Sequence, residues 1–393
     1  MSRTSSLGPG IIEGLSCVEA SMIGTYAYVF GSSGTSMLWV VVIPFLLWPL
    51  IEVSASVLGQ STHRDFLEVT KARYGDAAAA LTALSLMASN VSAMVAELVA
   101  ASLALSMLSG FPWPVFLPFS LSVLMLAPTV TGRHWKLVVM AGSIPMLAFP
   151  LTAALILFRN PSLLPSVAGG VFVRLPAFKG GDVAAVLGAT VAPDALFFAE
   201  ESGYEERAGM LGVEVGHAVA LLISLSVAVT FALSFDGVAP SGLSRIAGAL
   251  APTLGRYAYL IFPAALFSSC VAAFVVALRP WLSALSFLAG FSPLRREEFV
   301  PATLALVLGA SISLGLMTGW SSMAFEEAAY TSGVISSVGL VLPLLLLVAL
   351  VLDKKGAVGL PRSLELFLPV YALLIVGMVL ASLFTVLFRY GLR

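Results

Sequence analysis

The sequence predicts an all-α integral membrane protein, and three observations support this. Hydrophobic residues make up 59% of the 393 residues and charged residues only 10%, whereas a soluble domain carries about 25% charged residues. Apolar runs of the length that crosses a bilayer recur along the whole chain, and the charges gather in short connectors between them. So few charges cannot cover a soluble surface of this size. The lipid bilayer is therefore the expected partner, and no nucleic-acid partner is expected.

The apolar runs divide the chain into eleven predicted transmembrane helices. No connector is long enough for a soluble domain, so residues 1–393 are predicted to form one membrane domain. The segment 158–181 is too interrupted by Pro and Gly to cross, and we expect it to lie at the external interface. The predicted spans lie near 9–31, 35–58, 77–108, 112–131, 136–157, 183–203, 208–235, 256–288, 299–320, 328–352 and 364–389.

The distribution of Lys and Arg predicts the orientation of the chain, because short cytoplasmic loops carry an excess of these residues. Placing the N-terminus in the cytoplasm puts twelve of them inside and seven outside, and eleven crossings then put the C-terminus outside. Cys17 and Cys270 lie in apolar segments and are expected to be small buried hydrophobes. No cleavable signal peptide is predicted, since Glu13 and Glu19 interrupt the first apolar stretch.

Several ionisable residues fall at membrane depth, where a charge costs about 2.5–3.5 kcal/mol and usually marks a functional site. Glu52 is expected to bond a neighbouring backbone near the end of its span. Glu214 and His217 lie three residues apart on one helix face, and an interhelical hydrogen bond is favoured over a proton relay or a metal site. For Glu97, in the middle of its span, a functional and a structural role stay open. The adjacent acids Glu200 and Glu201 lie next to a cytoplasmic loop.

Glu19 and Asp194 stand in segments that predict broken helices. Glu19 lies in a stretch rich in Gly, Ser and Ala, and Asp194 follows Pro193, which removes a backbone donor. Interrupted helices at matching places in two halves are the best sequence sign of a transporter's central site. The alternative is a kink with a buried acid. The first reading implies an inverted five-plus-five repeat, with repeat one at about 9–157, repeat two at about 183–352 and an eleventh helix at about 364–389.

These segments resemble the Nramp family of proton-coupled divalent-metal transporters, and more closely its divergent Nramp-related members. The resemblance rests on the collinear stretches "GPGIIEG…SMIGTYAYVFG", "GQSTHRDFLEVTKARYG", "VAELVAASLALSML", "GATVAPDALFF" and "LVLPLLLLVALVLDKK". It implies a LeuT-type fold with discontinuous helices 1 and 6 and a substrate site between them. It also leads us to expect the plasma (inner) membrane of a prokaryote.

The matching positions depart from the family's motifs. The family's first-span Asp-Pro-Gly-Asn motif reads Glu19, Ala20, Ser21 and Met22 here. Its sixth-span Met-Pro-His motif reads Ala192, Pro193 and Asp194, and its third-span Asp and Glu pair is reduced to Met94 and Glu97. The resemblance therefore implies a substrate site of Glu19, Met22, Ala192 and Asp194. Glu19 and Asp194 would bind the metal, and Glu97 and Glu200 would lie on a proton path.

The function expected from these residues is secondary active transport of a divalent cation by alternating access, coupled to protons. Loss of the family's thioether at Ala192 favours a harder cation, because hard cations prefer oxygen ligands. Two alternatives stay open. A transporter of the same fold would bind an amino acid or amine through Glu19 or Asp194, and a membrane enzyme or receptor ranks last because no catalytic motif is present. No cofactor is expected.

Overall fold

The computed structural model describes residues 19–62, 64–131, 144–172, 180–191, 196, 206–235, 237–290, 298–353 and 362–391, and no strand occurs within these ranges. The main elements are α2 (Ala20–Ser33), η2 (Gly34–Met37), α3 (Trp39–Thr62), α4 (Phe66–Tyr74), α5 (Asp76–Ser109), η3 (Trp113–Phe116), α6 (Leu117–Thr131), α8 (Ala148–Arg159), α9 (Leu164–Val171), α10 (Gly180–Thr190), α12 (Glu206–Ser234), α13 (Leu243–Gly248), α14 (Ala251–Leu254), α15 (Ala258–Ala289), α16 (Val300–Met317), α17 (Ala324–Leu352) and α18 (Arg362–Gly391).

Each of the eleven predicted spans contains a helix. Within the described residues, seven helices are long and apolar enough to cross a membrane: α3, α5, α12, α15, α16, α17 and α18. The helices of the other four predicted spans are shorter in the described part of the chain, with 14 residues in α2, 15 in α6, 12 in α8 and 11 in α10. The chain is therefore an integral membrane protein.

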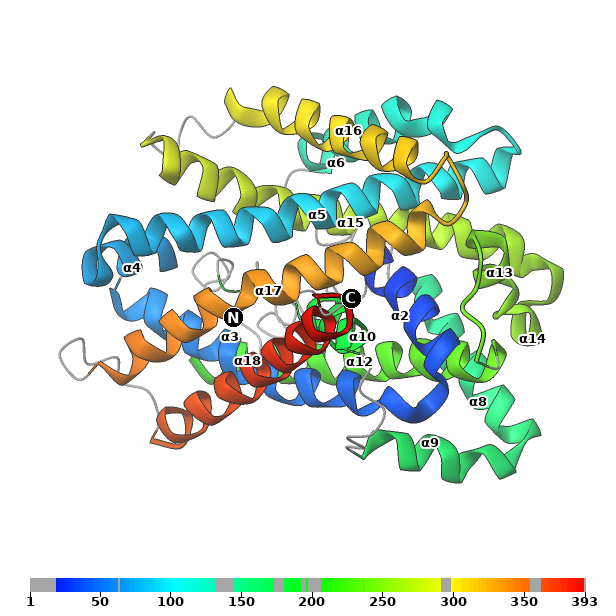
Figure 1. The fold of residues 1–393 in the computed structure, drawn as a ribbon, viewed down its shortest axis with the longest axis horizontal. Helices are drawn as coiled ribbons and strands as arrows, with labels where there is room; N and C mark the ends of the chain where they lie inside the picture. The colour runs from blue at the N-terminus through cyan, green and yellow to red at the C-terminus, as the bar shows by residue number, and fades with distance from the viewer. Residues whose placement is uncertain are drawn as a thin grey trace.

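Three long helices, α5, α15 and α17, run side by side across the molecule (Figure 1). The most extensive helix contacts are those of α5 with α15 and α17, and those of α17 with α10. The helix α12 packs against both α2 and α3, and α18 packs on α10 and α17. Figure 1 also shows α4 at one end of the long axis and α13 and α14 at the other. The two short helices α2 and α10 are thus enclosed by long ones.

Two glycines allow α10 and α17 to approach closely. A Cβ atom added to Gly188 would lie 1.8 Å from the carbonyl oxygen of Gly333, and one added to Gly333 would lie 2.3 Å from that of Ala185. In lipid, where burial of apolar surface gives no driving force between helices, small residues let backbones pack closely and gain van der Waals contacts. This contact fixes α10, which belongs to the sixth predicted span, against α17.

The chain changes direction after α8. The helix Pro161–Val171 turns by 103° from the axis of α8. Its hydroxyl at Ser166 lies 2.8 Å from that of Thr35 in η2, which ties it to the connection between α2 and α3. The segment 158–181 is more helical in its described part than its prolines and glycines suggest, and its place at the external interface stays a prediction.

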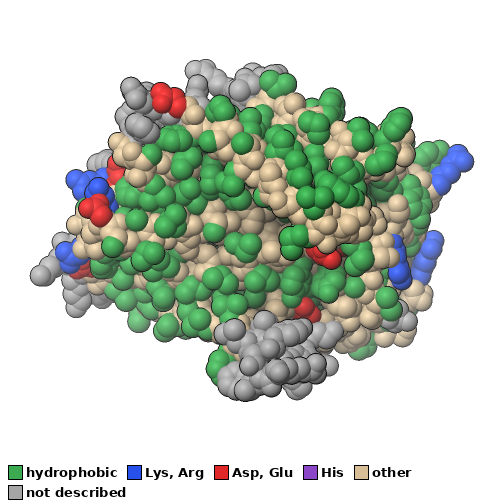
Figure 2. All heavy atoms as spheres, turned by 45° about the horizontal axis from the view of Figure 1, so that its top comes forward, with side chains coloured by type: hydrophobic (Ala, Val, Ile, Leu, Met, Phe, Trp, Pro, Cys, Tyr) green, Lys and Arg blue, Asp and Glu red, His purple; other side chains and the backbone are tan. Residues whose placement is uncertain are grey.

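Apolar and basic side chains occupy different parts of the surface. Figure 2 shows hydrophobic side chains across the middle of one face, with the Lys and Arg side chains gathered at its two ends. Lys71 and Arg73 belong to α4, at one end of the long axis, and Arg245 and Arg256 belong to the α13–α14 region at the other end. The sequence assigned these two pairs to opposite sides of the membrane, and the structure places them at opposite ends.

Candidate functional site

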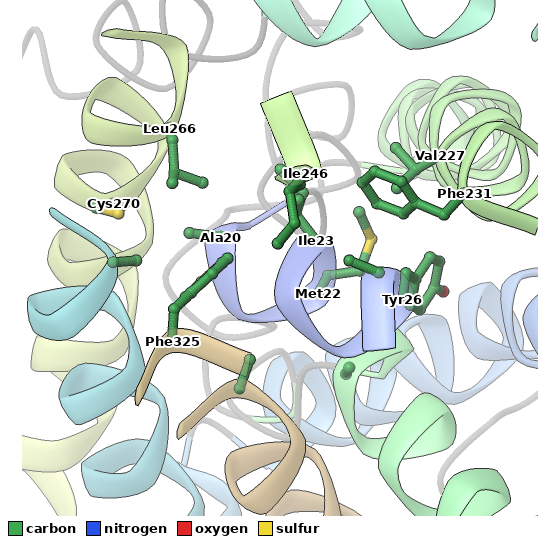
Figure 3. Close-up of a cluster of buried hydrophobic side chains, with 14 of the residues drawn as sticks. Ala20, Met22, Ile23, Tyr26, Val227, Phe231, Ile246, Leu266, Cys270 and Phe325 are labelled. Atoms are coloured by element: carbon green, nitrogen blue, oxygen red, sulfur yellow. The ribbon is translucent and has the colours of Figure 1, made fainter. Parts of the chain in front are cut away.

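The helix α2 begins inside the molecule, at Glu19. Glu19 has an extended backbone (φ −110°, ψ 169°), and its carbonyl oxygen accepts the first helical bond from the Ile23 amide, at 3.2 Å. Its carboxylate accepts a hydrogen bond from the Ser21 hydroxyl at 2.6 Å. Figure 3 shows Ala20, the first helical residue, between Leu266 and Cys270 on one side and Phe325 on the other. The start of α2 is therefore surrounded by α15 and α17 rather than lying at a membrane surface.

A second acid, Glu97 of α5, approaches the same helix start. Its side chain is fully buried, and Oε1 accepts a hydrogen bond from the Ser21 amide at 2.9 Å. The first amides of a helix have no partner within the helix and carry partial positive charge, so a carboxylate stabilises them. The Cys270 side chain neighbours the Glu97 carboxyl, while Oε2 has no hydrogen-bond partner within the described residues. Ser21 thus links Glu19 and Glu97, which the sequence placed in separate predicted roles.

Met22 turns away from this acidic pair. Its sulfur accepts a hydrogen bond from the Ser224 hydroxyl of α12 at 3.2 Å, and its side chain is fully buried. Figure 3 shows the side chain directed toward Val227 and Phe231 of the same helix. The thioether is therefore already engaged by a protein donor.

The helix α10, which belongs to the sixth predicted span, is held close to α2. The helix α10 ends at Thr190, after 11 residues, which is about 16 Å at the rise of an α-helix and too short to cross the apolar core. The Thr190 hydroxyl donates to the Val186 carbonyl at 2.6 Å, so Tyr26 donates to Thr190 across their 2.7 Å contact. The end of α10 is thereby joined to the second turn of α2. Ala192, Asp194, Glu200 and Glu201 lie outside the described residues.

Two other buried acids have partners that sequence spacing does not reveal. Glu52 of α3 lies 3.3 Å from Nε2 of His217 on α12, and both side chains are at most 2% exposed. Glu214 is exposed although it shares a helix face with His217. Glu326, in the first turn of α17, accepts a 2.6 Å hydrogen bond from the Gly242 amide. It therefore anchors the start of α13.

Tyr330, near the N-terminal end of α17, connects this helix to the first turn of α10. The Tyr330 hydroxyl donates to the Asp182 carboxylate at 3.2 Å, and the Tyr330 ring packs edge-on against Tyr28 of α2, with 5.3 Å between centroids. Sequence reasoning did not single out these three residues, which lie on three different helices. Their only sequence signal is an acid in the first turn of α10.

The described residues hold only part of the predicted metal site. No group of three His, Cys, Asp or Glu side chains lies close enough within them to hold an ion. The structure brings Glu19 and Glu97 to one helix start, and it turns Met22 toward α12. Asp194, the second predicted metal ligand, lies outside the described residues, so its pairing with Glu19 stays a prediction.

Comparison with known proteins gives relatives at the level of both sequence and fold. A profile of the family described as "Nramp: Natural resistance-associated macrophage protein-like" matches residues 10–386. A metal transporter of Populus trichocarpa, Nramp6.2, is 29% identical over 198 residues, which are 49% of this chain and 35% of the relative. The alignment therefore spans about a third of that relative's length.

Solved structures share the fold at low sequence identity. A manganese transporter of Eremococcus coleocola superposes with a TM-score of 0.74 and 14% identity, covering 96% of this chain and 85% of that one. MhsT, solved with L-phenylalanine, gives a TM-score of 0.65 and 14% identity, covering 95% and 98%. These likenesses confirm the predicted all-α, LeuT-type fold. Because the family profile covers nearly the whole sequence, the chain belongs to the Nramp family.

Proposed function

We propose that the chain is a secondary active transporter that moves a divalent metal cation across the membrane by alternating access, coupled to protons. The observation that carries the proposal is the start of α2, where Glu19 stands at a helix end inside the molecule and Ser21 links it to the buried Glu97. Non-helical backbone at membrane depth is tolerated only where it is buried in protein or lines a cavity. Membership of the Nramp family supports the choice of a metal cation, as do the names of the metal-transporting relatives.

In this proposal the substrate site comprises Glu19, Met22, Ala192 and Asp194, and the carboxylates of Glu19 and Asp194 bind the metal. Oxygen ligands suit a hard cation. Ala192 offers no sulfur, and the Met22 thioether accepts its hydrogen bond from Ser224, so Met22 lines the site without binding the metal. The site therefore favours hard divalent cations over soft ones.

Proton coupling follows from placing two carboxylates at one site. Without a cation the two negative charges repel, so one carboxylate holds a proton, which an incoming cation displaces. Glu97 and Glu200 form the proton path in this proposal. The buried position of Glu97 beside Ser21 supports its role. The N-terminus and the α4 end face the cytoplasm of a prokaryotic cell, and the C-terminus is external.

Uptake into proteoliposomes tests the proposal. Manganese, magnesium, calcium and a panel of amines are supplied outside, and the internal pH is recorded. We expect Mn²⁺ or Mg²⁺ uptake with proton movement, and about a tenfold or greater loss in Glu19→Gln and in Asp194→Asn, because removing one charged partner at a buried site costs about 2–5 kcal/mol.

The control is Glu68→Gln, which changes an exposed acid on α4 and should retain wild-type uptake. Amine uptake without metal uptake would replace the cation proposal with the amine alternative. Unchanged metal uptake in Asp194→Asn would refute the proposed site.

A further inference from the structure

A buried acid and a buried histidine form a pair between α3 and α12 that the proposed transport cycle leaves unused. Glu52 Oε1 and His217 Nε2 are 3.3 Å apart, and the side chains are 1% and 2% exposed. Both carboxylate oxygens of Glu52 are buried and neither accepts a hydrogen bond within the described residues, so the contact with His217 is a charge contact rather than a hydrogen bond. Ionisable groups at membrane depth are costly and mark ion or proton pathways when they face the protein interior.

The position of the pair connects it to the proposed substrate site. Ser224, which donates to Met22, and His217 lie seven residues apart on α12. Seven residues are close to two helical turns, so both side chains lie on one face of α12, about 10 Å apart along its axis. Glu214, one further turn toward the helix start, is exposed. His217 thus lies on α12 between the Met22 contact at Ser224 and the exposed Glu214, with the apolar Ala220 and Leu221 separating it from Ser224.

The chemistry of the pair suits a proton. A neutral imidazole beside a carboxylate carries a net charge of −1, whereas an imidazolium beside a carboxylate is neutral overall. The apolar surroundings favour the neutral combination. Gain and loss of one proton therefore changes the charge of the pair while leaving the covalent structure unchanged, which is how histidines serve as proton carriers.

Other charged side chains lie on or near α3 and α12, but none of those described forms an ion pair with Glu52. Within the described residues, Glu52 forms its ion pair with His217 alone. The described charged side chains on α3, α12 and the elements packed against them are Glu19 before α2, Glu214 on α12, Arg64, Asp65, Glu68, Lys71 and Arg73 at α4, Arg159 on α8, Asp182 on α10, and Glu326, Glu327 and Asp353 on α17 and its end.

We propose that the Glu52–His217 pair is a proton-binding site of this transporter, on the route between the Met22 end of the substrate site and the α4 face of the membrane. The inference rests on the proposed function, since the pair would be a second binding site for the coupled proton. A purely structural pair would fasten α3 to α12 and would hold its proton throughout the cycle.

The direct test reads the protonation of His217 without measuring transport. The chain has three histidines, so ¹⁵N-histidine labelling gives few NMR signals, and the loss of one in His217→Gln identifies His217. We expect this signal to change between about pH 5 and about pH 8, the range in which histidines titrate. Glu52→Gln should hold the imidazole neutral over more of that range, because it removes the charge that stabilises the imidazolium. A His217 signal that stays constant in the wild-type protein would overturn the proposal.

The second test measures coupling. Mn²⁺ uptake and internal pH are recorded together in proteoliposomes for Glu52→Gln and His217→Gln, with Glu326→Gln as the matched control for another buried acid. We expect proton flux per Mn²⁺ to fall about tenfold or more in the first two variants and to stay at the wild-type value in the control. Equal proton flux per Mn²⁺ in all of them would refute the site. If the wild-type protein moves neither Mn²⁺ nor Mg²⁺, the transport proposal fails, while the NMR titration of the wild-type protein still decides whether the pair binds a proton.

Discussion

Met22 packs α2 against α12 in the structure, and the residues around its side chain explain why. The sequence places its sulfur next to the predicted metal ligand Glu19, which admits a soft ligand at the site. In the structure the sulfur accepts a hydrogen bond from Ser224 and the side chain is fully buried. Its contribution is therefore packing between α2 and α12.

We expect Met22→Leu to fold with a loss of less than about 1.5 kcal/mol, because the exchange conserves volume. Divalent-cation binding should stay within about threefold of wild type, a change of about 0.6 kcal/mol, because the sulfur is bonded to Ser224 rather than to the metal. Calorimetric titration with Mn²⁺ and with the softer Cd²⁺ measures the effect. A selective loss of Cd²⁺ binding would show that the sulfur does bind the metal.

At the scale of elements, the contact of α10 with α17 depends on the absence of side chains at Gly188 and Gly333. A methyl group on Gly188 would overlap the Gly333 carbonyl oxygen and the Ser337 amide nitrogen, both of which are backbone atoms that cannot rotate away. The two helices would have to separate, and with them the end of α10 at Thr190 would move.

Gly188→Ala should lower stability by about 1–3 kcal/mol through overpacking. The matched control is Gly309→Ala on α16, where an added Cβ meets no atom within 4 Å. That change should stabilise by up to about 1 kcal/mol, because glycine weakens a helix interior. Thermal unfolding in detergent compares the two variants. Equal melting temperatures would contradict the close contact of α10 and α17.

The hydrogen bond from Tyr26 to Thr190 joins α2 to α10, the described parts of the two broken spans. Because Thr190 also donates to Val186, its hydroxyl remains bonded when Tyr26 loses its own. Tyr26→Phe should therefore cost about 0.5–1.5 kcal/mol. Thermal unfolding of Tyr26→Phe, Thr190→Val and the double variant measures the coupling of the two residues. Additive losses would show that this bond does not hold α2 and α10 together.

At the scale of the whole molecule, the basic residues predict which end faces the cytoplasm. The exposed Tyr74 lies at the α4 end and the exposed Tyr257 at the opposite end, next to α14. Single cysteines at these two positions, in a Cys17→Ala background, report the side of the membrane. The buried Cys270 should stay unlabelled.

A membrane-impermeant maleimide should label Tyr257→Cys in intact cells, and should label Tyr74→Cys only after the membrane is opened. The reason is the excess of Lys and Arg in the loops assigned to the α4 side. The reverse labelling pattern would show that the N-terminus is external.

The sequence by itself determined the membrane class and a helix in each of the eleven predicted spans, and α2 starts directly after Glu19, where the sequence predicts a break. These properties depend on composition and on short runs of residues, because a bilayer requires about 20 apolar residues per crossing and leaves unpaired backbone costly at its centre. The family resemblance added the LeuT-type arrangement, which the comparisons confirm.

Only the tertiary structure decided which polar groups meet. Glu52 and His217 are 165 positions apart, Tyr26 and Thr190 are 164 apart, and no spacing along one helix brings such residues together. The hydrogen bond from the Ser21 amide to Glu97 likewise spans 76 positions. Partners of this kind are set by how helices pack around one another, which depends on the shapes of many small side chains at once rather than on any local pattern.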